Sequence, residues 1–318
     1  MTYPTRRAFP AVAACCAALA VLTTACQGGK PGAPHTSPPT PTTSGQAEPS
    51  IFDKKSVIVG VKKGEPGFNT LSGVEYENAG FEKDLVEFLA DELDFKASLR
   101  TMPSLKREEM LTDEEVDLVV ATYTISDSRD KTIDFTAPYF KTYQGVLVRE
   151  GDDRIEKRTD LEGMRVCSAY GSTSDPDSET EKEAQEDIKE ALGDIKPGFR
   201  NDYKACVKDL EKGNFDAVWT DKVILEGFAA SSSYDVEVVK NITIENRQFY
   251  GIGIREGHEQ DCRALNKALD KFLDTRWRTV FQSHFSELAK TEGDDFEQVY
   301  RPSDADFTNY EASSCGAG

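Results

Sequence analysis

Short β-branched runs alternate with amphipathic helical segments over residues 56–120, and this alternation constrains the fold more than any other feature of the chain. The order predicted from periodicity is a strand at 56–62, a helix at 80–93, a strand at 95–100, a helix at 104–115 and a strand at 116–120. Within the second helix we expect Leu105 and Leu111 to face inward. Alternation of this kind is typical of an α/β fold with an open parallel sheet, in which ligands bind at the carboxyl ends of the strands.

A second set of strands and helices follows, and it lies between two similar extended stretches at 143–150 and 248–256. An economical interpretation is a two-lobed fold in which one lobe is inserted into the other and the chain crosses twice. Two crossing strands make a hinge, and the cleft between the lobes makes a site. The expected boundaries are 51–145 with 253–300 for lobe 1, 146–252 for lobe 2, and 301–318 for a polar tail that is loosely attached unless Cys315 pins it.

The N-terminal segment has the layout of an export signal. Two arginines precede an apolar stretch at 11–22, which is too short for an ordinary spanning helix, and small residues lead to Cys26. We predict a lipoprotein signal peptide at 1–25, lipidation of Cys26, and a Pro-, Thr- and Gly-rich disordered tether at 26–50. A permanent membrane anchor is the alternative, and the export route, Sec or Tat, stays open.

Charge and composition exclude several classes of function. The formal net charge is −19, and loss of the leader would remove two arginines and make it more negative. Nucleic-acid binding requires basic surface, so we expect no nucleic-acid partner. Three histidines and the absence of a CxxC motif give no metal signature, and we expect neither metal nor cofactor. The acidic balance does not exclude a small anionic ligand, because one pocket can be locally positive.

Four cysteines remain beyond the leader and Cys26. Disulfides form outside the cytoplasm, and four cysteines can pair in three ways. We favour Cys167 with Cys206 and Cys262 with Cys315, because each pair then joins residues of one lobe. Free buried thiols are the alternative.

A hydroxyl-rich turn follows the strand at 116–120 and contains Thr122, Thr124 and, five residues later, Arg129. An arginine offers a planar, permanently charged fork that suits a carboxylate, and hydroxyl groups at a strand tip add donors. The competing interpretation is a surface ion pair of this arginine with Asp127 or Asp130.

Five segments, VGVK, GFEKDL, VDLVVATYTISDSRDKTIDFTAPYF, LEGMRVCSAYGST and DAVWTDKVILEGFA, run in order across about 51–290. As a set they resemble the extracytoplasmic solute-binding proteins of the polar amino-acid family, and among these the glutamate-binding lipoproteins most. The resemblance implies the type II periplasmic-binding-protein fold. It also implies a monomeric receptor, lipid-anchored to the outer face of the cytoplasmic membrane, that delivers an amino acid to ABC permease and ATPase subunits.

The family's ligand contacts can be transferred to the matching positions. For an amino-acid α-carboxylate they imply Thr124, Arg129, Ser172 and Thr173. For the α-ammonium they imply Thr122 and Asp221, although Asp221 could instead be only a helix N-cap.

The ligand side chain depends on four further positions. Phe68 matches an aromatic residue that stacks on the ligand in the family, whereas a second aromatic position is Ser104 here. Lys62, Ser104 and Arg107 match positions that bind a distal carboxylate in acidic-amino-acid receptors, so the resemblance favours glutamate, with aspartate or glutamine as alternatives. A sensory ligand-presenting protein and, less favoured, a dehydratase-like enzyme are the rival functions. No Ser-His-Asp pattern is present, and we expect no catalysis.

Overall fold

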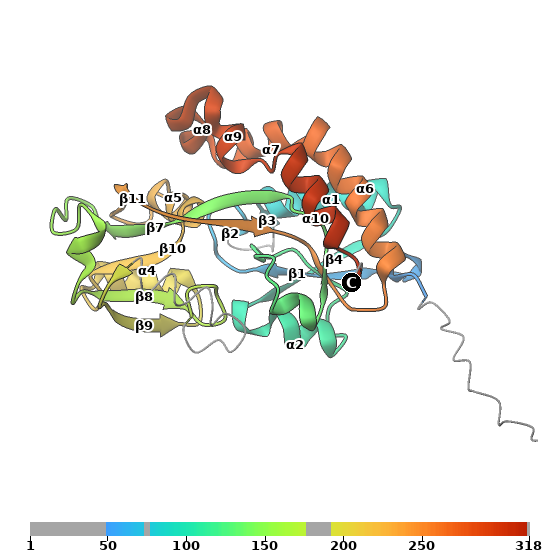
Figure 1. Ribbon diagram of the computed structural model, residues 1–318, viewed down its shortest axis with the longest axis horizontal. Coiled ribbons are helices and arrows are strands. Elements are labelled where there is room, and N and C mark those ends of the chain that lie inside the picture. Colours follow the sequence, from blue (N-terminus) through green and yellow to red (C-terminus); the bar gives the residue numbers. More distant parts are fainter. Residues whose placement is uncertain (1–48, 73–76, 176–191, 317–318) are drawn as a thin grey trace, which may run out of the picture. The chain divides into compact units, whose positions relative to one another are not determined.

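The protein is described from a computed structural model that covers residues 49–72, 77–175 and 192–316 (Figure 1). The expected signal peptide at 1–25, Cys26 and nearly all of the tether at 26–50 lie outside the described residues, so these stay predictions. None of the helices in the described part of the chain combines the length and apolar composition that a membrane-spanning helix needs.

The first sheet contains the strands of the predicted 56–120 alternation. Its central strand β1 (Val57–Lys62) pairs in parallel with β4 (Ala97–Met102) and β5 (Leu118–Val119), which confirms the parallel arrangement expected there. Beyond β5 the sheet turns antiparallel, through β12 (Gly253–Ile254) and β6 (Asp134–Phe135). The connecting helices are α1 (Phe81–Glu92), the 3₁₀ turn η2 (Ser104–Lys106) and α2 (Arg107–Thr112).

Leu105 does not face inward as predicted. Its side chain is 57% exposed, whereas Leu111 is fully buried as expected. The segment opens with the 3₁₀ turn η2 rather than an α-helix, and a 3₁₀ turn advances each side chain by a larger angle than the α-helical spacing assumes.

The second sheet has five strands in the order β11-β7-β10-β8-β9. Strands β8, β9 and β10 run parallel to one another where they pair, whereas β7 pairs antiparallel with β10 and β11. Helices α4 and α5 connect its strands (Figure 1). The bounds are β7 (Phe140–Arg149), β8 (Arg165–Ala169), β9 (Lys196–Arg200), α4 (Tyr203–Glu211), β10 (Ala217–Asp221), α5 (Lys222–Ala229) and β11 (Val236–Tyr250).

The chain passes between the sheets at 136–139, from β6 into β7, and at 251–252, from β11 into β12. Two crossings were expected, but the boundary placed at 145/146 falls inside β7. The stretch that was expected to begin anew at 248 is the end of one fifteen-residue strand, β11, which pairs with β7 through two register shifts. Sequence periodicity cannot locate a short crossing between two strands, because the chain is extended on both sides of it.

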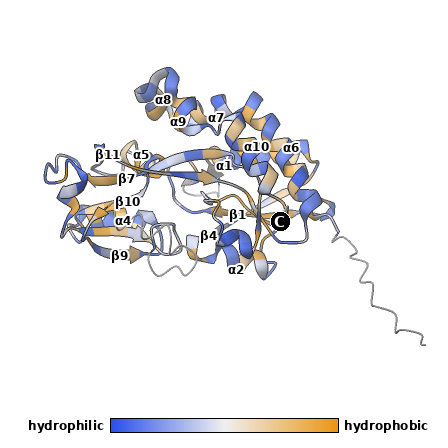
Figure 2. Ribbon diagram, viewed as in Figure 1, coloured by the Kyte–Doolittle hydropathy of each residue, from blue (hydrophilic) through white to orange (hydrophobic). Residues whose placement is uncertain are grey.

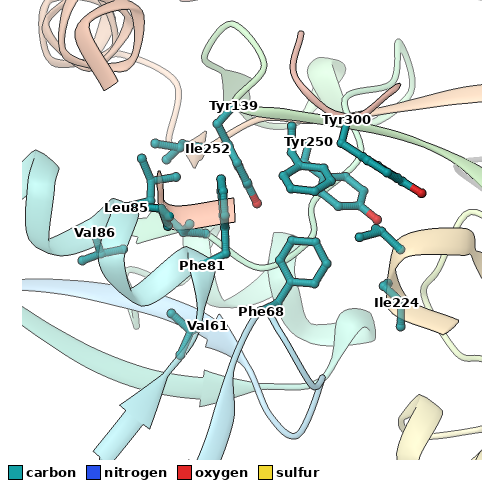
Figure 3. Close-up of a cluster of buried hydrophobic side chains, with 14 of the residues drawn as sticks. Val61, Phe68, Phe81, Leu85, Val86, Tyr139, Ile224, Tyr250, Ile252 and Tyr300 are labelled. Carbon is teal, nitrogen blue, oxygen red and sulfur yellow. The ribbon is translucent and has the colours of Figure 1, made fainter. Parts of the chain in front are cut away.

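An aromatic cluster lies beside the crossings (Figure 3). The ring of Phe140 at the start of β7 is 5.1 Å from that of Phe81 in α1, 5.2 Å from that of Phe68, and 5.8 Å from that of Tyr250 at the end of β11. All four side chains are fully buried. Packing of this kind, about 0.5–1.5 kcal/mol per aromatic pair beyond area burial, ties the crossing strands to the first lobe.

The C-terminal region is helical and packs against the rest of the fold. Helix α10 begins after a Ser303 capping box, Phe307 is buried, and the ring of Tyr310 lies 5.0 Å from that of Phe249 in β11. Hydrophilic and hydrophobic stretches alternate along these helices (Figure 2). The 301–318 tail is therefore attached through the part that the structure describes. The bounds are α6 (Glu259–Thr275), α7 (Trp277–His284), α8 (Ser286–Glu292), α9 (Phe296–Tyr300) and α10 (Asp304–Ser313).

Both expected disulfides are present. Cys167 in β8 is bonded to Cys206 in α4, and Cys262 in α6 is bonded to Cys315 after α10. Each bond therefore joins elements that pack on one sheet, and the second one pins the tail.

Candidate functional site

A polar cavity lies where the ends of the two sheets meet, and we call it the inter-sheet cavity. Its volume is about 10 Å³, roughly the space that one water molecule needs, so the two walls lie nearly against each other. Each lining residue lies at the carboxyl end of a strand or on the segment that follows it, where open α/β sheets bind ligands. The lining residues are Lys62, Ser104, Arg107, Thr122, Thr124, Arg129, Ser172, Thr173, Tyr203, Asp221 and Ile224.

The structure brings together every expected ligand residue except one. Phe68 is absent from the cavity lining because its ring is fully buried in the aromatic cluster, within 5.9 Å of the ring centre of Tyr250 (Figure 3). The expectation that Phe68 stacks on a ligand therefore stays a prediction. Tyr203 and Ile224 line the cavity and were not predicted as site residues, although Tyr203 has the inward-facing helical spacing of a core residue.

Arg129 is buried, so the alternative of a surface ion pair does not apply. Its side chain is 1% exposed and lies at the start of a 3₁₀ turn after the hydroxyl-rich segment. Nη1 donates to the carbonyl of Thr124 at 2.8 Å, and Nε lies 3.2 Å from a carboxylate oxygen of Glu108. The guanidinium also lies 5.2 Å from the ring centre of Tyr123. These contacts fix the orientation of the guanidinium at the cavity wall.

Arg107 directs most of its donors at backbone carbonyls. Nε donates to Ser104, Nη1 donates to Ala121 and Thr122, and Nη2 donates to Gly171, over distances of 2.8–3.2 Å. Burial lowers the pKa of Arg107 from its usual value, and the neighbouring positive charge of Arg129 acts in the same direction. Four of its five N–H groups are thus engaged, which leaves one N–H for a ligand.

The carbonyl of Gly171 joins the two cavity walls. It accepts from Nη2 of Arg107 at 2.8 Å and from Nη2 of Arg129 at 3.4 Å. Gly171 has a φ of +70°, and a Cβ there would lie 2.4 Å from the Cα of Leu105. Only glycine therefore allows this turn of the second sheet to approach η2 so closely.

Lys62 is buried at the end of β1 beside its own counterion. Its Nζ lies 2.9 Å from Glu65 Oε1, donates to the hydroxyl of Ser104, and lies 5.4 Å from the ring centre of Tyr203. Glu65 is 2% exposed and accepts at 3.1 Å from the hydroxyl of Thr122. The ammonium and the Ser104 hydroxyl thus share one corner of the cavity.

Asp221 faces these cations from the end of β10. Its Oδ2 accepts from the hydroxyl of Tyr250, whereas Oδ1 is buried without a hydrogen-bond partner in the described structure. Burial raises the pKa of Asp221 to about 7, although the Tyr250 hydrogen bond acts in the opposite direction. Asp221 occupies the N-cap position of α5, but its side chain makes no capping hydrogen bond. The simple N-cap interpretation therefore does not explain this side chain. A buried carboxylate oxygen without a donor favours a positively charged partner.

Hydroxyl groups from the turn after β8 complete the second wall. Ser172 Oγ donates to Ala169 O at 2.7 Å, and Thr173 Oγ1 accepts from Gln144 Nε2 at 3.2 Å. Both side chains are buried. Within the described ranges, no group of three or more His, Cys, Asp or Glu side chains is arranged to hold a metal ion.

Residues 57–287 match the model of the family described as bacterial extracellular solute-binding proteins, family 3. The chain is 31% identical over 252 residues to the glutamate-binding protein GluB of Corynebacterium glutamicum, with 75% of this chain and 81% of that protein covered. It is 28% identical over 247 residues to the ABC transporter glutamine-binding protein GlnH of Bacillus subtilis, with 75% and 84% covered.

Solved structures give the same fold. An ancestral arginine-binding protein bound to arginine superposes with a TM-score of 0.63 at 26% identity, over 73% of this chain and 99% of that one. The fold is therefore that of a two-lobed α/β binding protein, as expected. The chain belongs to the bacterial extracellular solute-binding proteins, family 3.

Proposed function

We propose that this protein captures a free polar amino acid, most favourably glutamate, and delivers it to an ABC permease. The observation that carries the proposal is the opposition of charges in the inter-sheet cavity. Arg129 lies on one wall, and the unpartnered oxygen of Asp221 lies on the other. An amino-acid zwitterion has one pole for each.

The α-carboxylate would be bound by Arg129 and by hydroxyl groups from both walls. The Thr124, Ser172 and Thr173 side chains all line the cavity and supply neutral donors. The α-ammonium would bind Asp221 Oδ1 and the Thr122 carbonyl, which already accepts from Arg107 at 3.1 Å and has a second lone pair.

Glutamate is favoured because cations outnumber acids in the cavity lining. Lys62, Arg107 and Arg129 line it together with one carboxylate, that of Asp221. The distal carboxylate would bind Lys62, the Ser104 hydroxyl and the remaining N–H of Arg107. Relatives named for glutamate and for glutamine binding support this ligand class.

We further propose that the protein acts as a monomer, is lipid-anchored through Cys26 outside the cytoplasmic membrane, and catalyses no reaction. The curated relatives above are named as binding proteins, which supports a receptor without chemistry. In this mechanism the ligand bridges both walls and favours the form in which they are joined.

Calorimetric titration of the chain from residue 49 with each of the twenty amino acids tests the proposal. We expect submillimolar affinity for glutamate and weaker binding of aspartate and glutamine, with ligand recovered unchanged after hours of incubation. Absence of binding by any amino acid would contradict the ligand class, and consumption of ligand would contradict the receptor mechanism.

A further inference from the structure

We propose that Glu82 is a positioning residue that sets ligand affinity by holding Thr122 in a left-handed backbone conformation at the wall of the inter-sheet cavity. This inference rests on the proposed function, because its main readout is amino-acid binding. Glu82 itself is not part of the cavity lining.

Glu82 is a fully buried carboxylate in the first turn of α1, and three donors converge on it. Oε1 accepts from the backbone N–H of Thr122 at 2.5 Å and from the hydroxyl of Tyr139 at 2.6 Å. Oε2 accepts from Asn69 Nδ2 at 2.6 Å. Burial raises the pKa of Glu82 to about 7, although the hydrogen bonds from Tyr139 and Thr122 act in the opposite direction. Three hydrogen bonds on one buried carboxyl group fix its orientation, so this group can impose a conformation on what it holds.

Thr122 needs such support because its φ is +43°. A β-branched residue in the left-handed region is strained, and the strain persists only when the surroundings enforce it. Three buried side chains do so: Glu82 accepts from its N–H, Glu65 accepts from its hydroxyl, and Arg107 donates to its carbonyl.

The consequence reaches the ligand because Thr122 and Thr124 both line the cavity, and the Thr124 carbonyl orients Arg129. If the N–H of Thr122 were released, the turn could relax toward an ordinary backbone conformation. The cavity-facing groups of the turn would then move together. Loss of Glu82 should therefore weaken ligand binding by more than a generic loss of stability explains.

Asp117 provides a matched control. It is also a buried carboxylate of the first lobe, accepts at 2.7 Å from the N–H of Ile58, and pairs with Lys54. None of these residues lines the cavity. Asp117→Leu removes a buried carboxylate without touching the ligand-binding turn.

The experiment compares glutamate affinity and thermal stability in Glu82→Leu, Glu82→Gln and Asp117→Leu. We expect Glu82→Leu to lose at least about tenfold in affinity, equivalent to about 1.4 kcal/mol. Glu82→Gln should stay within about threefold of the wild type, because its amide oxygen can accept from Thr122 while Asn69 turns its amide. Asp117→Leu should lower the melting temperature and leave affinity unchanged. If Glu82→Leu does not fold, Glu82→Ala, which leaves room for water, replaces it with the same expectation.

Two further measurements separate this inference from the proposed function. In a Thr122→Gly background, where glycine accepts a positive φ without strain, Glu82→Leu should cost less than about threefold. Amide exchange at Thr122, measured without ligand, should rise at least about tenfold in Glu82→Leu and not in Glu82→Gln. Equal affinity of Glu82→Leu and wild type, or an undiminished loss in the glycine background, would overturn the inference. If the wild type binds no amino acid, the proposed function fails, while unchanged exchange at Thr122 would still count against Glu82.

Discussion

The wall that the first sheet contributes to the inter-sheet cavity carries three cations, whereas the wall from the second sheet carries hydroxyl groups, the apolar Ile224 and one carboxylate. Each cation of the first wall already has protein partners: Glu65 for Lys62, Glu108 for Arg129, and four backbone carbonyl bonds for Arg107. The second wall instead leaves an oxygen of Asp221 without a donor. The first wall is pre-oriented, and the second gains an interaction only when a cationic group arrives.

The comparison predicts that the largest loss of affinity comes from the second wall. Asp221→Ala removes the only acid in the described lining and leaves the ligand ammonium buried without a counterion. Breaking a buried pair in this way costs about 3–5 kcal/mol, so we expect affinity to fall by at least about 100-fold in calorimetry.

Asp216→Ala is the control for that measurement. Asp216 is a buried acid just before the same strand, paired with Arg165 at 2.9 Å and outside the cavity lining. It should lower stability and spare affinity. An Asp221→Ala protein that still binds within about tenfold of the wild type would show that the second wall does not hold the ammonium.

Arg129→Lys should have the next largest effect. Lysine keeps the charge but cannot present a planar fork, and it cannot both bond the Thr124 carbonyl and grip a carboxylate with two parallel donors. We expect a loss of about 2 kcal/mol, or roughly 30-fold, by titration calorimetry. Arg149→Lys, a half-buried arginine that bonds the Leu210 and Phe215 carbonyls of the second lobe, is the matched control and should leave affinity unchanged. Equal losses in both variants would mean that the fork of Arg129 is structural only.

Many residues of both walls could be predicted from sequence, because the predicted strand ends show which residues lie at the carboxyl edge of each sheet. The hydroxyl-rich turn after 116–120, Asp221 after β10 and the turn after β8 all follow apolar runs, and strand ends meet at one site in this fold. The five sequence segments that resemble the amino-acid receptors then assigned a ligand contact to each of these residues. Glu65 and Glu82 stayed hidden because an acid on an amphipathic helix or in a glycine-rich loop is normally solvated, and only tertiary contacts reveal burial.

Phe68 shows what the sequence does not reveal. Its position along the chain matches an aromatic residue that contacts ligand in the family, and only the structure shows that four rings pack around it: Phe81, Phe140, Tyr250 and Phe285. Side-chain direction depends on neighbours from distant segments, and one sequence does not show them. The same reason applies to Leu105, whose exposure follows from a 3₁₀ turn that periodicity treats as helix.

Selectivity between glutamate and glutamine tests which cation of the first wall binds the distal carboxylate. Lys62→Met removes the ammonium that we assign to the distal carboxylate but keeps the length of the side chain. We expect glutamate to lose about tenfold and glutamine to lose less than about threefold, because a neutral amide gains little from the charge. Lys63→Met, at the exposed neighbour, is the control. If both ligands weaken equally, the distal assignment to Lys62 is wrong.

Protonation of Asp221 gives the smallest and most gradual effect. Burial raises its pKa to about 7 in the free protein, although Lys62 and Arg107 favour the charged form and Glu65 opposes it. A bound ammonium favours the ionised carboxylate, so it lowers this pKa, and binding releases a proton near neutral pH. Affinity should therefore rise with pH, by up to about tenfold between pH 6 and 8, and level off above. Titrations in buffers of different ionisation enthalpy count the released proton. Proton uptake, or an affinity that falls over this range, would mean that Asp221 is already ionised before the ligand binds. The contrast between the two walls would then have another origin.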